Sequence, residues 1–128
     1  MEPGFDTVRL ADAAVVTAPD GSAVKPLCSL PGVASFAHFE LAAEQVSQAV
    51  SHVTVQEIWY VVASGGRMWR GDGTGQAVTE LVPGVCLTIP LGTAFQFRAG
   101  RAGLRVVAVT VPPWPDDSGE ACPEHGPW

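Results

Sequence analysis

The chain has 128 residues, of which 47% are hydrophobic and 16% are charged, enough to bury one domain-sized core. Its net charge of −6 and seven scattered Lys and Arg residues argue against a nucleic-acid partner or an anionic membrane surface. No apolar run approaches the roughly 20 residues that cross a bilayer, and the N-terminus lacks the pattern of a secretory signal. Three cysteines argue against a disulfide framework, so we expect a cytoplasmic protein.

Short β-rich runs separated by Gly and Pro indicate an all-β sandwich or barrel rather than alternating strands and helices. We predict strands at residues 7–10, 13–17, 34–41, 47–52, 57–63, 67–70, 77–81, 85–89, 95–99 and 104–111. Turns are predicted at residues 64–66, 71–73, 83–84, 90–92 and 99–100. Only residues 41–50 have a helix-like composition, so at most one short helix is expected.

The distribution of Gly, Pro and acidic residues along the chain also predicts the domain organisation. Residues 1–111 are expected to form a single barrel domain that includes the N-terminal strands. Residues 112–128 form a tail rich in Pro and acidic residues. The tail either lies over the barrel, held by Trp114 and Trp128, or is disordered.

Two spaced patterns between residues 50 and 97 carry a family resemblance. Glu57 opens the strand EIWYVV and is followed by Gly65 and Gly66, and Gly84, Pro90 and Gly92 follow at fixed spacing. The two patterns resemble, in order, the two motifs of the cupin family. The resemblance implies a cupin β-barrel, also called a double-stranded β-helix or jelly roll, with a cavity that takes a small molecule. Small cupins commonly form dimers, so the resemblance also implies a homodimer.

The family binds Fe, Mn, Ni, Cu or Zn through about three His and one Glu, but the first motif here is incomplete. With the longer family spacing, Glu57 places the second His at His52 and the first at Val50. With the shorter spacing, the two His positions fall on Ser51 and Val53.

The second motif departs further, because its His position falls on Phe95, which cannot bind a metal. At best two of four ligands remain, His52 and Glu57. A tightly bound divalent metal is therefore not the first expectation, although these two residues would be its ligands if one binds.

His52 and Glu57 are the candidate catalytic residues. An imidazole exchanges protons near neutral pH, and an inward-pointing carboxylate in an apolar barrel is suited to proton transfer. If both side chains point inward, they form an acid/base pair. The alternatives are a His with one structural hydrogen bond at a strand end and a Glu in water at the barrel rim.

Other residues could bind the ligand. His38 could supply a third nitrogen from a neighbouring strand, although a structural role is the plainer reading. Aromatic residues could line an enlarged apolar pocket or belong to the core; they are Trp59, Tyr60, Trp69, Phe95 and Phe97. Side chains alternate along a strand, so either the two Phe or Gln96 and Arg98 face inward, and we expect the Phe pair.

Three functions remain open. The first is an enzyme of secondary metabolism, of isomerase or cyclase type, that acts on a small and largely apolar metabolite without a tightly held metal. The second is a metal-dependent enzyme such as a dioxygenase that uses His52, Glu57 and His38. The third is a small-molecule binding protein that is not an enzyme.

Overall fold

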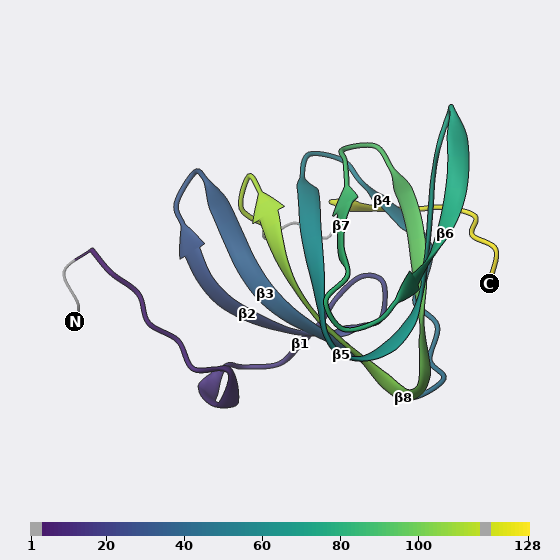
Figure 1. Ribbon diagram of the computed structural model, residues 1–128. Helices are drawn as coiled ribbons and strands as arrows, with labels where there is room; N and C mark the ends of the chain where they lie inside the picture. The colour runs from purple at the N-terminus through teal and green to yellow at the C-terminus, as the bar shows by residue number, and fades with distance from the viewer. Residues whose placement is uncertain (1–3, 116–118) are drawn as a thin grey trace.

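The computed structural model describes residues 4–115 and 119–128, which form an almost entirely β structure (Figure 1). The strands in chain order are β1 (Val16–Thr17), β2 (Ala23–Leu30), β3 (Ala34–Leu41), β4 (Val50–His52), β5 (Gln56–Asp72), β6 (Gly75–Leu81), β7 (Cys86–Ile89), β8 (Ala94–Val111) and β9 (Ala121–Pro123). Within these residues the helical structure is a single 3-10 turn, Leu10–Asp12, and no helix could span a membrane. The expected all-β class is confirmed.

The sheet is organised around its two long strands, β5 and β8, which pair with each other antiparallel along most of their length. The first half of β8 also pairs with β4, and its second half pairs with β3. Strand β5 pairs in addition with β6 and β7, and β2 extends the sheet beyond β3. Because β5 and β8 take part in both halves, the sheet curls into a half-barrel (Figure 1).

Glycines allow the two long strands to bend without ending. A Cβ on Gly66 would lie 2.0 Å from the Arg98 carbonyl oxygen, so only glycine permits this close approach of the backbones. Ser64 and Gly103 have positive φ angles at the corresponding bends. The turns predicted at residues 64–66 and 99–100 are therefore wrong: these residues form bends inside continuous strands, with shifts of register.

Other predicted elements also differ. Residues 7–10 are not a strand, and residues 41–50 form no helix because Glu44 takes a φ of 64° that interrupts a right-handed helix. Strand β2 was not predicted, and it contains Pro26, a residue that strands accept only at edges or irregularities. The sheet accommodates Pro26 beside an irregularity of register between Pro26 and Ser29.

The strand alternation determines which side chains enter the barrel. Along β5, Glu57, Trp59 and Val61 are buried on the inner face, whereas Ile58 and Tyr60 are about half exposed on the outer face. The inner side chains join those of β8 in one apolar core cluster. The charged Glu57 is therefore placed in an apolar environment by its position in the strand.

The described part of the tail lies against the barrel. Strand β9 pairs with β4, and the buried carboxylate of Glu120 accepts hydrogen bonds from the backbone of Thr54 and Val55. At the end of the chain, Trp128 and the side chain of Gln96 exchange two hydrogen bonds of 3.0 and 3.1 Å. These contacts explain why Gln96 is buried although it points away from the barrel interior.

Candidate functional site

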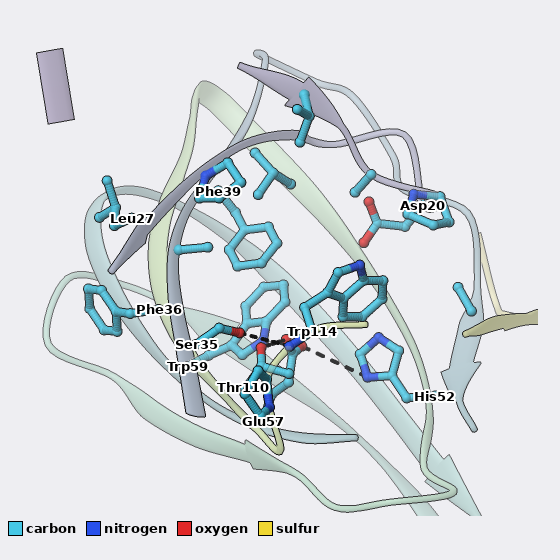
Figure 2. A pocket seen from close by; sticks show the side chains of 18 of the residues that line it. Asp20, Leu27, Ser35, Phe36, Phe39, His52, Glu57, Trp59, Thr110 and Trp114 are labelled. Carbon is cyan, nitrogen blue, oxygen red and sulfur yellow. Dashed lines mark hydrogen bonds and ion pairs between the residues drawn. The ribbon is translucent and has the colours of Figure 1, made fainter. Parts of the chain in front are cut away.

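A cavity of about 980 Å³ opens on the inner side of the curled sheet. Its walls come from β1 to β5 with the turn between β1 and β2, from β8 and β9, and from residues 113–114 of the tail (Figure 2). Most lining side chains are apolar, and the polar ones include Asp20, His52, Glu57 and Thr110. A concave, largely apolar site with a few convergent polar groups is the usual form of a small-molecule pocket.

His52 and Glu57 meet inside this cavity. Both are buried, with 7% and 5% of their surface exposed, and His52 Nδ1 lies 4.0 Å from Glu57 Oε1. That distance is too long for a direct hydrogen bond. His52 Nδ1 has no hydrogen-bond partner, which costs roughly 1–3 kcal/mol for a buried polar atom. His38 Nδ1 also lacks a partner and lies 3.9 Å from Glu40 Oε1, but His38 does not line the cavity. At His52, a ligand in the cavity can supply the missing hydrogen bond.

Glu57 is held in place by two donors. Trp59, two residues further along the same face of β5, donates its Nε1–H to Oε1 at 3.1 Å. Thr110, the direct partner of Glu57 on β8, donates its hydroxyl to Oε2 at 2.5 Å. A carboxylate has about four acceptor sites, so both oxygens keep capacity for a further hydrogen bond. The carboxylate is thus fixed in position and still able to interact.

Aromatic side chains form the apolar walls. Phe39 stacks on Trp59 with ring centroids 5.4 Å apart. The His52 ring lies between Phe95 and Trp114, each 5.2 Å away in an edge-on arrangement. Phe97 contacts Trp59 at 5.0 Å, but it packs in the core behind the cavity wall. Phe95 and Phe97 face inward as expected, and of the two it is Phe95 that lines the cavity.

Three predicted ligand-binding residues do not line this cavity. His38 lies on β3 between two cavity-lining residues, Ala37 and Phe39, so alternation turns its side chain to the opposite face. Tyr60 is 49% exposed on the outer face of β5 for the same reason. Trp69 lies beyond the bend of β5, where its Nε1 donates to the Gln76 side chain at 2.9 Å.

Three lining residues were missing from the predicted site. Asp20 lies in the turn between β1 and β2, Thr110 near the end of β8, and Trp114 in the tail. Trp114 had been considered only as a residue that could hold the tail. The Asp-Gly-Ser sequence at residues 20–22 was an available signal of a structured turn, but nothing in it indicated a position at the cavity.

Burial shifts the pKa of two titratable groups in opposite directions. Burial raises the pKa of Asp20, an effect that hydrogen bonds from Ser22 and the nearby His52 oppose in part. On the outer face, burial lowers the pKa of His38, although Glu40 opposes this shift. Asp20 therefore lies in the cavity in an environment that disfavours its charged form.

The residues present do not fit a tightly bound metal. No group of three or more His, Cys, Asp or Glu side chains in residues 4–115 and 119–128 is placed to hold a metal ion. Val50 and Phe95, at two of the ligand positions that the cupin resemblance implies, line the cavity with carbon atoms. His38, the third nitrogen of the dioxygenase hypothesis, lies on the other face of the sheet. Two ligands fall short of the three protein ligands usual at catalytic transition-metal sites.

Several solved structures are similar to this chain in their overall architecture. KdgF from a Halomonas species superimposes with a TM-score of 0.74 at 18% identity, over 88% of this chain and 97% of that chain. Pac13 from Streptomyces, in complex with uridine, gives a TM-score of 0.75 at 11% identity, over 97% and 93%. CapF from Staphylococcus aureus, a capsular polysaccharide assembling protein, gives 0.76 at 10% identity, over 89% of this chain and 33% of that chain.

These structural neighbours are cupin-fold proteins, so the chain has the cupin fold that its two sequence motifs indicated. No protein-family model and no curated protein matches the sequence. At identities of this level the likeness establishes the fold, and the chemistry has to be argued from the cavity itself.

Proposed function

We propose that this protein is an enzyme that binds a small, largely apolar organic metabolite in its barrel and moves a proton on it without a tightly bound metal. The observation that carries the proposal is the unpartnered Nδ1 of buried His52, 4.0 Å from a Glu57 carboxylate that two other side chains hold in place. Proton transfer of this kind serves isomerisation, cyclisation and elimination. A place in secondary metabolism fits such a pocket.

In the proposed step, a C–H bond of the substrate breaks and its proton passes to His52. The electron pair stays on the substrate, where an adjacent acceptor group takes it up, and the proton then returns at another atom. No oxidant or reductant is needed. Glu57 stabilises the imidazolium, because opposite charges about 4 Å apart attract each other.

The solved neighbours lend general support to an enzyme. Pac13 is described as a nucleoside dehydratase, and dehydration is an elimination that requires proton transfer. A cupin barrel of similar shape therefore serves as a frame for chemistry of this class.

A homodimer stays a prediction within this proposal. The outer face of β5 exposes a row of apolar residues, Ile58, Tyr60 and Val62, each about half exposed. A second copy of the chain that covered this row would remove it from water.

A generic proton-transfer substrate tests the chemistry before the natural metabolite is known. In 5-nitrobenzisoxazole, a base removes the C3 proton, the electron pair forms a nitrile and the N–O bond breaks to release a coloured phenolate. We expect the wild type to accelerate this reaction above buffer. His52→Gln should lower the rate by about 100-fold, the usual size of a general-base contribution. Glu57→Gln should lower it by about 10-fold through loss of the counter-charge.

Matched controls are available outside the cavity. His125→Gln and Glu80→Gln make the same changes at exposed positions and should leave the rate unchanged. Thermal unfolding checks each variant, and His52→Asn replaces His52→Gln if the latter does not fold. No acceleration by the wild type, full activity in both cavity variants, or a requirement for added Fe, Mn, Zn, Ni or Cu would contradict the proposal.

A further inference from the structure

Asp20 gives the cavity a second carboxylate besides that of Glu57. Its side chain is buried in the turn before β2, and Figure 2 shows the carboxylate turned toward the pocket interior. The Ser22 backbone N–H and hydroxyl both donate to Asp20 Oδ1, at 2.9 and 2.6 Å. No described residue donates a hydrogen bond to Oδ2, so this oxygen is available to a ligand.

The cavity has acidic groups and no basic counterpart apart from His52. None of its lining residues is a lysine or an arginine. Two arginines are engaged outside the cavity, where Arg67 pairs with Glu80 and Arg105 pairs with Glu40 on exposed side chains. The six residues outside the described part also contain no lysine or arginine. A negatively charged ligand would therefore find no countercharge from Lys or Arg in this pocket.

The aromatic walls of the cavity also disfavour an anionic ligand. The faces of Phe39, Trp59 and Trp114 carry the negative side of the ring quadrupole, which attracts cations and repels anions. The chain as a whole has a net charge of −6, so its surroundings add a negative potential. In the same cavity, the buried and unpartnered Nδ1 of His52 indicates where the reacting part of a ligand would lie.

We propose that the substrate carries no negative charge and presents a hydrogen-bond donor, a hydroxyl, amide N–H or ammonium group, to Asp20 while its ring system lies against the aromatic wall. Asp20 is thus the specificity-determining residue, and His52 with Glu57 acts on the reacting part of the substrate. This inference rests on the proposed function for the location of the reacting end. It excludes free carboxylates and phosphate esters as substrates.

Three indoles with one ring system and different charge test this selection: neutral tryptophol, cationic tryptamine and anionic indole-3-acetate. Binding is measured by NMR titration of the wild type, through the indole N–H signals of Trp59 and Trp114, which line the cavity. We expect tryptophol and tryptamine to bind at least about 10-fold more tightly than indole-3-acetate, a difference of about 1.4 kcal/mol.

Asp20→Asn should weaken tryptamine binding several-fold. It should also reduce the difference in affinity between indole-3-acetate and tryptophol. Asp72→Asn, the same change in a similar turn outside the cavity, should alter neither ratio. Equal or tighter binding of indole-3-acetate by the wild type would overturn the inference, as would a failure of all three probes to shift the Trp59 and Trp114 signals. The wild-type ranking suffices if Asp20→Asn does not fold.

The two proposals fail in different ways. Tight binding of the anionic probe would refute the charge selection and leave the proton transfer by His52 and Glu57 untouched. Full proton-transfer activity in His52→Gln and Glu57→Gln would refute the proposed function, whereas the order of probe affinities would still measure the role of Asp20.

Discussion

Two turns of the chain have nearly the same sequence and share two hydrogen bonds, but they hold their aspartates in opposite environments. Asp20-Gly21-Ser22 precedes β2, and Asp72-Gly73-Thr74 joins β5 to β6. In each turn, Oδ1 of the aspartate accepts from the backbone N–H and the hydroxyl of the residue two positions later. The hydrogen-bond distances in the two turns agree within 0.1 Å, at 2.9 and 2.6 Å against 2.8 and 2.7 Å. Asp72 Oδ1 accepts a third hydrogen bond, from the Gly75 N–H at 3.2 Å.

Solvent exposure separates the two turns. Burial raises the pKa of Asp20 in spite of its two hydrogen bonds. At exposed Asp72, the hydrogen bonds from Thr74 lower the pKa. The same local motif is therefore a surface turn in one place and a polar group at a ligand cavity in the other. The difference lies in what surrounds the turn, because desolvation acts on the charged form whatever the local hydrogen bonds.

The largest difference in stability between the two turns is expected when the hydroxyl that donates to each aspartate is removed. Ser22 is fully buried, and Ser22→Ala deprives the buried Asp20 carboxylate of a short hydrogen bond. We expect a loss of about 2 kcal/mol in the free energy of unfolding, typical of a hydrogen bond to a charged group. Thr74→Ala should cost clearly less, since water replaces its hydroxyl. Urea unfolding of both variants measures this, and equal losses would break the comparison.

A smaller change in folding stability is expected from Asp20→Asn, and this change depends on pH. The folded pKa of Asp20 is raised above its ordinary value of 3.8, so its contribution to stability is present below that value and lost as the pH rises through the folded pKa. The variant should be more stable than the wild type at neutral pH, because asparagine carries no charge that burial desolvates. Thermal unfolding at several pH values measures the gain, which should disappear in acid.

The smallest effect is expected from Asp72→Asn, with the opposite sign. The folded pKa of Asp72 is lowered from 3.8, so its contribution to stability is present above that value and lost as the pH falls through the folded pKa. The variant should unfold at a slightly lower temperature than the wild type at neutral pH and at the same temperature in strong acid. A gain in stability at neutral pH, like that of Asp20→Asn, would show that exposure does not distinguish the two turns.

The positions of the two catalytic candidates were predicted well by residue spacing within the cupin motifs. His52 and Glu57 were chosen from their positions relative to the cupin motifs, and they lie together because β4 and β5 are each held against β8. Phe95 was expected to replace a ligand with an apolar side chain, and it lines the cavity beside His52. These placements depend on strand order and alternation, which the motifs carry.

The misplaced candidates were chosen by residue type instead. His38 and Tyr60 are plausible ligand-binding residues in isolation, but a shift of one residue along a strand turns a side chain to the opposite face. Bends within β5 and β8 could not be distinguished from turns, because glycine serves both. Strand β2 was not predicted, and the proline within it is tolerated only in particular surroundings, which a single sequence does not show.

The sequence by itself determined the all-β class, the cupin motifs and the loss of metal-ligand positions at Val50 and Phe95, because these depend on residue identity and spacing along the chain. Only the tertiary structure decided that Asp20, Thr110 and Trp114 belong to the same cavity as His52 and Glu57. Asp20 and Trp114 lie outside the strands and far apart in the sequence, yet both line this cavity. Burial, which raises the pKa of Asp20, depends on everything packed around it.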